Sequence, residues 1–202
     1  MENQNNLEKF VDLYKSRLIN LYESIDMKML NKIVEAMINC FQNGNSMYVV
    51  GNGGSAATAS HFQADFRFFV RYFTEFRPKV FALTDNVPLI TAISNDNDYE
   101  DVFVEQMRGL FKPGDLLLAI SASGNSKNVL KAVEFAKKLG GITIGFCGFS
   151  GGKLKEITDL PLYTPNVQKD YGPIEDLHMI LNHILINYIV TDNGFLEIKT
   201  HF

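Results

Sequence analysis

The sequence predicts an α/β protein in which helices cover both faces of a parallel sheet. After residue 45, short and continuously apolar runs alternate with stretches of helical periodicity. Strands that are apolar on both faces are typical of buried parallel sheets. In addition, glycine-rich or serine-rich turns directly follow two of the apolar runs. Such turns are expected at the carboxyl edge of the sheet, where ligands of these folds bind.

The order of the elements follows from the same patterns. Two helices open the chain, at Leu7–Tyr22 and Met27–Phe41, and Asn43-Gly44-Asn45 ends the second. Five strands are predicted at Met47–Val50, Val80–Leu83, Leu116–Ile120, Ile142–Phe146 and Leu160–Tyr163. Further helices are predicted at residues 55–70, 87–94, 99–109, 126–139 and 173–191. Because Pro161 cannot donate to a central ladder, the last strand should lie at an edge.

Composition and charge restrict the class of protein. The 202 residues suffice for one substantial domain with a hydrophobic core, and the net charge of -4 does not favour nucleic acid as a partner. No apolar run resembles a signal peptide or reaches the length of a membrane span. Cys40 and Cys147 lie far apart in apolar segments, as buried free thiols of a reducing compartment do. We therefore expect a soluble, cytoplasmic protein without a membrane or nucleic-acid partner.

The most informative motif is the turn Gly51–Ser55, which follows an apolar strand and opens a helix. Such a turn directs backbone N–H groups outward at a helix N-terminus, where the helix dipole favours an anion such as phosphate. Further along the same helix, His61 and Asp65 are four residues apart and share one face. An anion site with an acid/base or metal-binding pair beside it indicates chemistry on a phosphorylated small molecule.

A second turn, Ser121–Ser126, offers three hydroxyl groups after another buried strand. Hydroxyls and backbone N–H groups donate to phosphate oxygens, although an ordinary helix cap would need only one serine. The Gly-Lys-Ser/Thr ending of a triphosphate-binding loop is missing from both turns, which argues against nucleotide hydrolysis. Because both turns follow parallel strands, they should line one crevice at the same sheet edge.

The last helix carries Glu175, His178 and His183. Glu175 and His183 are eight residues apart, or about 12 Å of helical rise. They can reach one small atom only through a helix irregularity or a second copy of the site. Each histidine could also be a hydrogen-bonded interior residue. Asn95 and Asp96 lie in a predicted polar loop, residues 94–98, where they could serve either the turn or a binding site.

Residues 66–79 interleave arginine and lysine with aromatic residues. Such a segment could stack on single-stranded nucleic acid. The acidic net charge and the helical spacing favour another interpretation, a buried aromatic face at a subunit contact.

Together and in this order, the glycine turn with His61 and Asp65, Asn95-Asp96, the serine turn and the histidine-bearing last helix resemble the sugar isomerase (SIS) domain. More narrowly, they resemble its phosphoheptose isomerase branch. The resemblance covers nearly the whole chain, residues 1–202 as one domain, with the helices of residues 4–43 as a packing and oligomerisation element. It implies a three-layer sandwich with a five-stranded, flavodoxin-like parallel sheet, and a homotetramer with shared active sites. It also implies conversion of sedoheptulose 7-phosphate to a heptose 7-phosphate, often with zinc.

The resemblance also implies roles for individual residues. The expected substrate-binding residues are Asn52, Gly53, Gly54, Ser55, Asn95, Asp96, Ser121, Ser123, Ser126 and Glu175. The expected zinc ligands are His61, Asp65, Glu175 and His183. Asp65 and His183 are the expected catalytic base and acid. The family has glutamate where this chain has Asp65, and glutamine where it has Glu175. It usually has threonine at Ala122 and commonly arginine at Pro173.

These differences leave three functions in view. The first is an aldose–ketose isomerase acting on a phosphorylated sugar for surface-polysaccharide biosynthesis. The second is a non-catalytic relative that serves as a partner of the bacterial replication initiator, because that branch lacks the glutamate at the position of Asp65. The third is a sugar-phosphate sensor without turnover. The retained acid at position 65, with His183 and Glu175, favours the isomerase.

Overall fold

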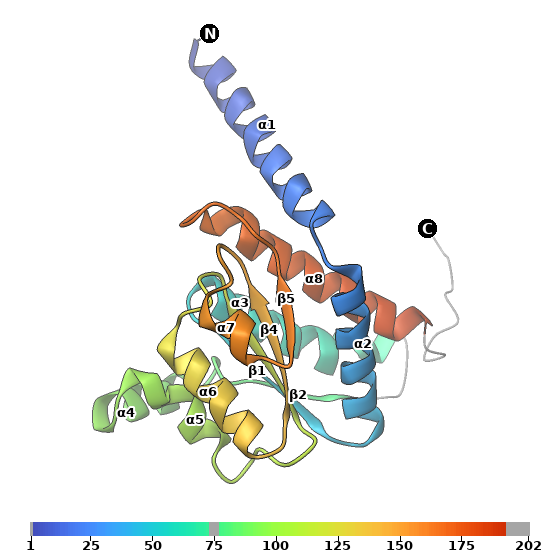
Figure 1. Ribbon diagram of the computed structural model, residues 1–202, viewed down its shortest axis with the longest axis vertical. Coiled ribbons are helices and arrows are strands. Elements are labelled where there is room, and N and C mark those ends of the chain that lie inside the picture. The colour runs from blue at the N-terminus through green and yellow to red at the C-terminus, as the bar shows by residue number, and fades with distance from the viewer. Residues whose placement is uncertain (1, 73–76, 193–202) are drawn as a thin grey trace.

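The computed structural model describes residues 2–72 and 77–192, and it confirms the predicted parallel α/β sandwich (Figure 1). All five strands pair in parallel, in the order β2-β1-β3-β4-β5. The strands are β1 (Ser46–Val50), β2 (Lys79–Ala82), β3 (Leu116–Ser121), β4 (Ile142–Cys147) and β5 (Leu160–Tyr163). The strand order reverses between β1 and β3, and ligands bind at such switch points in open α/β sheets. The strand with Pro161 lies at an edge, as predicted.

Helices cover both faces of the sheet. The helices of the described residues are α1 (Glu2–Glu23), α2 (Met27–Gln42), α3 (Gly54–Arg67), α4 (Val87–Asp96), α5 (Val102–Met107), α6 (Lys127–Lys138), α7 (Gly152–Ile157) and α8 (Tyr171–Asp192), with short 3-10 segments η1 (Phe69–Tyr72) and η2 (Tyr99–Asp101). Alternate residues of the strands point to opposite faces. Leu116 and Leu118 of β3 therefore pack with α2, α3 and α8, while Leu117 packs with α5, α6 and α7.

Three local predictions differ from the structure. Asn95 and Asp96 are the last two residues of α4 rather than part of a loop. The side chain of Asn86 caps the start of α4. No residue of α4 is buried, so its polar last residues can remain helical in solvent. The short helix α7 was not predicted, because six residues carry too little periodicity to show a face. The predicted helix at residues 99–109 is divided into η2 and α5.

Helix α1 extends beyond the sandwich, and its contacts with the body are near the start of α8 (Figure 1). Tyr14 donates a hydrogen bond to Asp176, and Arg17 pairs with Asp170 at 3.6 Å. Burial and the neighbouring Asp176 raise the pKa of Tyr14 to about 12. Much of the apolar surface of α1 faces solvent in the single chain; its exposed residues include Leu7, Phe10, Val11, Leu13, Ile19 and Tyr22.

The aromatic segment after His61 is only partly interior. Phe66 is fully buried and stacks on Phe62, with 6.0 Å between the ring centroids, whereas Phe68 is 55% exposed. Phe73 and Phe76, which belong to the predicted aromatic face, lie outside the described residues. Both cysteines are buried as predicted, and burial raises the pKa of each thiol to about 12. Within the described residues, no helix has the length and apolar character needed to cross a membrane.

Candidate active site

The two predicted anion-binding turns meet at the carboxyl edge of the sheet, after the adjacent strands β1 and β3. They enclose a cavity of about 290 Å³. Its lining contains eight of the predicted substrate residues, Asn52, Gly53, Gly54, Ser55, Ser121, Ser123, Ser126 and Glu175. Ile120, Ala122 and Tyr171 complete it. The structure therefore brings together most of the predicted binding residues in a single chain.

The serine turn is held by hydrogen bonds among its own groups. The hydroxyls of Ser121 and Ser126 are 3.1 Å apart, and the Gly124 amide donates to Ser121 Oγ at 3.2 Å. The amide of Asn125 donates to Ser123 Oγ at 3.3 Å. These bonds curl the turn around the cavity. One of the Ser121 and Ser126 hydroxyls donates to the other, so the second hydroxyl of that pair and the Ser123 hydroxyl keep a proton that can be offered to a bound phosphate.

Two helices begin at the cavity, and neither has a side-chain cap. The capping residues, Gly53 of α3 and Ser126 of α6, make no side-chain cap hydrogen bond. Their first-turn N–H groups and helix dipoles favour an anion at this position. Within the described part of the chain, no lysine or arginine lines the cavity. Its attraction for an anion therefore depends on oriented N–H and O–H groups.

Glu175 is the charged residue of the cavity lining. Its carboxylate packs so closely against Gly54 that a methyl group on that glycine would overlap it. Burial, followed by the charge of Asp176, raises the pKa of Glu175 above its usual value. A phosphate in the same cavity would favour the protonated form of this side chain further.

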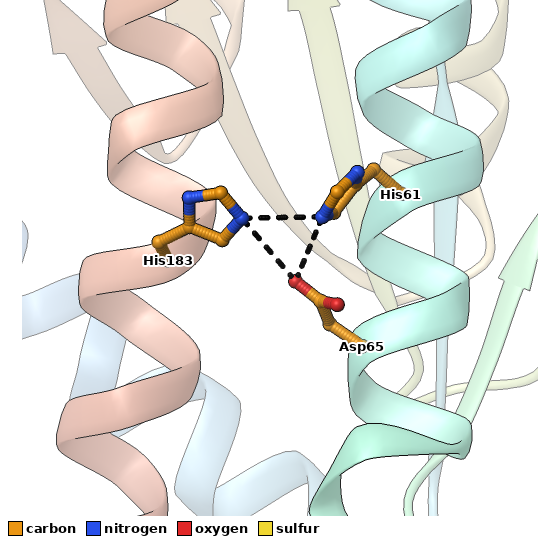
Figure 2. Close-up of side chains that lie close together, drawn as sticks. All are labelled: His61, Asp65 and His183. Carbon is orange, nitrogen blue, oxygen red and sulfur yellow. Dashed lines mark hydrogen bonds and ion pairs between the residues drawn. The ribbon is translucent and has the colours of Figure 1, made fainter.

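A second cluster lies between α3 and α8 and contains His61, Asp65 and His183 (Figure 2). The Nε2 atoms of the two histidines are 3.1 Å apart. Asp65 Oδ2 lies 3.3 Å from His61 Nε2 and 3.8 Å from His183 Nε2. The histidine side chains are 42% and 51% exposed, respectively, and Asp65 is 17% exposed. The cluster is therefore open to solvent on the histidine side.

The geometry of this cluster fits a zinc ion. Ligand atoms about 2.0 Å from a tetrahedral zinc ion lie about 3.3 Å from one another, close to the separations of these three atoms. Two imidazole nitrogens and one carboxylate oxygen are also a typical donor set of catalytic zinc sites, which leave further positions open.

Glu175 does not join this cluster in the single chain. Helix α8 is continuous from Tyr171 to Asp192, and the group of potential metal ligands in the described residues contains only His61, Asp65 and His183. The eight residues from Glu175 to His183 therefore keep their separation of about 12 Å. Of the four expected ligands, the single chain thus brings together His61, Asp65 and His183, and with α8 continuous, Glu175 could reach the cluster only from a second copy of the chain.

Asn95 and Asp96 also lie apart from the cavity. The Asn95 amide donates to the Asp96 carboxylate at 2.8 Å, and both side chains are exposed at the end of α4. Asp96 lines a different groove, with Leu89 and Glu105. The single chain thus places these two predicted substrate residues away from the phosphate cavity.

Sequence reasoning missed two asparagines that support the site. The buried Asn128 of α6 hydrogen-bonds Asn52 of the glycine turn, and the buried Asn182 of α8 donates to Asp65 Oδ2 at 2.7 Å. Each asparagine stands beside apolar residues in the interior-facing part of its helix. An amide on an otherwise apolar helix face is the signal that could have identified them.

Fold and site define a phosphosugar-binding domain of the isomerase class, and comparison with known proteins agrees. The model of the SIS domain family matches residues 9–148. The phosphoheptose isomerase of Aliarcobacter butzleri is 41% identical over 162 residues, covering 79% of this chain and 83% of that protein. That of Helicobacter pylori strain P12 is 39% identical over 177 residues, covering 87% and 90%.

Solved structures give the same result. The phosphoheptose isomerase of Neisseria gonorrhoeae superimposes with a TM-score of 0.81 at 31% identity, covering 91% of this chain and 98% of that one. The corresponding Francisella tularensis structure has a TM-score of 0.82 at 28% identity, covering 94% and 98%. The chain therefore belongs to the SIS domain family and, within it, to the phosphoheptose isomerases.

Proposed function

We propose that this isomerase converts sedoheptulose 7-phosphate to a heptose 7-phosphate. The observation that carries the proposal is the pairing of an anion cavity built from uncapped helix N-termini with a His61–Asp65–His183 cluster on two of the helices that border it. The similar proteins are named for a phosphoheptose substrate. In the cell, the product would enter heptose synthesis for a surface polysaccharide, and the enzyme would be cytoplasmic.

The reaction exchanges a carbonyl and a hydroxyl between C1 and C2 of the sugar. One proton leaves C1 and one arrives at C2, while O1 loses a proton and O2 gains one. Asp65 is the base for the carbon-bound proton, through the carboxylate oxygen that does not bind the metal, and His183 serves the sugar oxygens as acid and base through a ring nitrogen that does not bind the metal. His61, Asp65 and His183 would hold a zinc ion, which when bound supplies Lewis-acid polarisation of the sugar oxygens.

The serine turn and the N-termini of α3 and α6 would hold the phosphate end of the substrate. This contact fixes the position of the carbon chain, so that its other end lies beside the acid and base groups. Such positioning lowers the barrier by removing the entropy of bringing the groups together.

We further propose a homotetramer in which each active site is shared between copies. Glu175 and His183 are separated by about 12 Å along a continuous helix, so a neighbouring copy is needed to bring Glu175 to the metal cluster. The exposed apolar side chains of α1, among them Leu7 (65% exposed) and Phe10 (59%), offer surface for such an assembly. None of the residues of α4 is buried in the single chain.

The catalytic proposal is tested by metal analysis of the purified protein, followed by an NMR assay with sedoheptulose 7-phosphate. We expect about one zinc per chain and formation of the aldose phosphate, which Asp65→Ala abolishes. Glu134→Gln, an exposed carboxylate of α6 that pairs with Lys153, should retain full activity. A protein that binds the sugar phosphate but holds no metal and gives no turnover would instead be a binding protein of this family.

Light scattering tests the assembly. The native chain should have the mass of a tetramer, and the double change Leu7→Glu with Phe10→Glu should reduce that mass. Lys15→Glu places the same charge at an exposed position of α1 and should leave the tetramer intact. A monomeric native protein would contradict the shared site.

A further inference from the structure

We infer that Asn182 is a positioning residue that holds Asp65 Oδ2 in place for the metal cluster. The inference rests on the proposed function, in that it assigns a role at the same site. Asn182 lies on α8, immediately before His183, whereas Asp65 lies on α3. The contact therefore joins the two helices that supply the cluster.

The contact is short and completely buried. Asn182 is 0% exposed, and its Nδ2 donates to Asp65 Oδ2 at 2.7 Å. The same oxygen faces His61 Nε2 at 3.3 Å and His183 Nε2 at 3.8 Å. The amide thus approaches the oxygen from the protein interior, and the histidines approach it from the solvent side. Rotation of the carboxylate away from the histidines would break the buried hydrogen bond.

The orientation of the amide follows from the charge of its partner. An asparagine side chain offers N–H groups on one side and a carbonyl oxygen on the other. Only the orientation with Nδ2 toward Asp65 attracts a carboxylate, since the reverse would place two oxygens in contact. In that orientation Asn182 Oδ1 is buried and has no hydrogen-bond partner among the described residues.

That unpaired oxygen makes a purely structural role a poor explanation. Burying a polar atom without a partner lowers the stability of the fold. A leucine has the same branching and the same number of side-chain heavy atoms as asparagine and would bury no polar atom, as is the case for the neighbouring buried Leu181. A side chain that weakens the core while binding one oxygen of the metal cluster is better explained by what it does to that oxygen.

The identity of residue 65 explains why such support matters here. The carboxylate of aspartate lies about 1.5 Å closer to the backbone than that of glutamate, so it reaches a metal over a smaller range of side-chain rotations. Ligating carboxylates are commonly fixed by hydrogen bonds from residues behind them, and loss of such a partner typically lowers metal affinity or activity about 10- to 100-fold. Asn182 supplies this hydrogen bond for Asp65.

The test compares Asn182→Leu with Leu181→Ala, a cavity-forming change at the adjacent buried position. Zinc affinity is measured by competition with a chromophoric chelator, and ligand geometry is measured from the absorption spectrum of the cobalt-substituted protein. We expect Asn182→Leu to weaken zinc binding about 10- to 100-fold and to alter the cobalt spectrum. Leu181→Ala should lower the melting temperature but leave both readouts unchanged. If the leucine variant does not fold, Asn182→Ser should give the same changes in metal binding.

A second background separates positioning from general damage. With Asp65→Glu, the longer carboxylate reaches the cluster from a different position, so Asn182→Leu should then have little effect on zinc affinity. An equal loss in both backgrounds, or native zinc affinity with an unchanged cobalt spectrum in Asn182→Leu, would overturn the inference. If the native protein binds zinc and Asn182→Leu weakens that binding as expected, but the protein does not isomerise sedoheptulose 7-phosphate, the proposed function fails while the role of Asn182 stands.

Discussion

Asn52 and Asn128 hydrogen-bond each other through both side-chain amides, with 2.9 Å between nitrogen and oxygen in each direction. The pair joins the glycine turn after β1 to the first turn of α6, and the hydroxyl of Tyr99 adds a donor to Asn52 Oδ1 at 2.8 Å. The two turns that border the anion cavity are therefore held at a fixed separation by side chains as well as by the sheet.

Replacing Asn128 should loosen this connection. Asn128→Leu removes both amide hydrogen bonds at a buried position, so we expect a loss of about 1–3 kcal/mol in the free energy of unfolding. We also expect a roughly tenfold higher KM for the sugar phosphate, because the cavity loses its fixed width. Chemical denaturation and steady-state kinetics measure the two effects. Thr143→Val removes two hydrogen bonds with Asp159 at a buried position near the start of β4, and it should lower stability without raising KM.

Gly124 is needed at the bend of the serine turn. Its φ is +67°, and a methyl group there would overlap the carbonyl oxygen of Gly151. Gly124→Ala should therefore destabilise the protein by more than the roughly 1–2 kcal/mol of a left-handed backbone alone, and it should weaken phosphate binding. Gly44→Ala is the matched control, because Gly44 has φ +72° with open space around it. Equal losses from the two substitutions, measured by thermal unfolding, would contradict the close packing of the turn.

Glu175→Gln should stabilise the metal-free protein in a manner that depends on pH. Because the folded-state pKa of Glu175 is raised, chiefly by burial, its ionised form is less favourable in the folded protein than in the unfolded chain. The glutamine variant should therefore be the more stable protein at pH 7. This advantage should shrink as the pH falls through the raised pKa toward the ordinary value of 4.5, where the native side chain becomes neutral as well. Melting temperatures between pH 4 and 7.5 test this, and an advantage that is constant with pH would contradict it.

His178 should make the fold sensitive to acid. It is 1% exposed, neither ring nitrogen has a hydrogen-bond partner among the described residues, and burial lowers its pKa from 6.5 to about 3. Protonation is then favoured in the unfolded chain, so stability is full above pH 6.5 and is lost as the pH falls from there toward 3. His178→Phe should be at least as stable at pH 7 and should unfold less readily at pH 4.5. Parallel denaturant titrations at the two values measure this difference, and identical acid sensitivity in both proteins would refute it.

Local patterns were sufficient for much of the fold and the cavity. Each of the five strands is an apolar run bounded by turn residues, and parallel strands place the turns that follow β1 and β3 at one edge. The part of the cavity lining that these two turns supply could therefore be predicted, whereas Tyr171 and Glu175 come from α8. Asn95 and Asp96 were misplaced because polar residues suit an exposed helix end as well as a loop. Residue-level patterns do not separate those two cases.

The metal cluster was predicted in part, and the reason is geometric. His61 and Asp65 are one helical turn apart, so the sequence alone places them on one face of α3. Likewise, the spacing of Glu175 and His183 already indicated that one chain could not bring both to a single atom, and the continuous α8 agrees.

The sequence by itself thus determined the order of elements, the edge of the sheet that binds anions and the pair on α3, because backbone periodicity and turn chemistry act between near neighbours. Only the tertiary structure decided that His183 faces His61, that Asn182 supports Asp65 and that Asn128 joins Asn52. These contacts connect residues 76 to 122 positions apart, and they depend on how helices pack against one another and against the sheet. Packing of that kind is set by the shapes of many side chains together, which no local pattern contains.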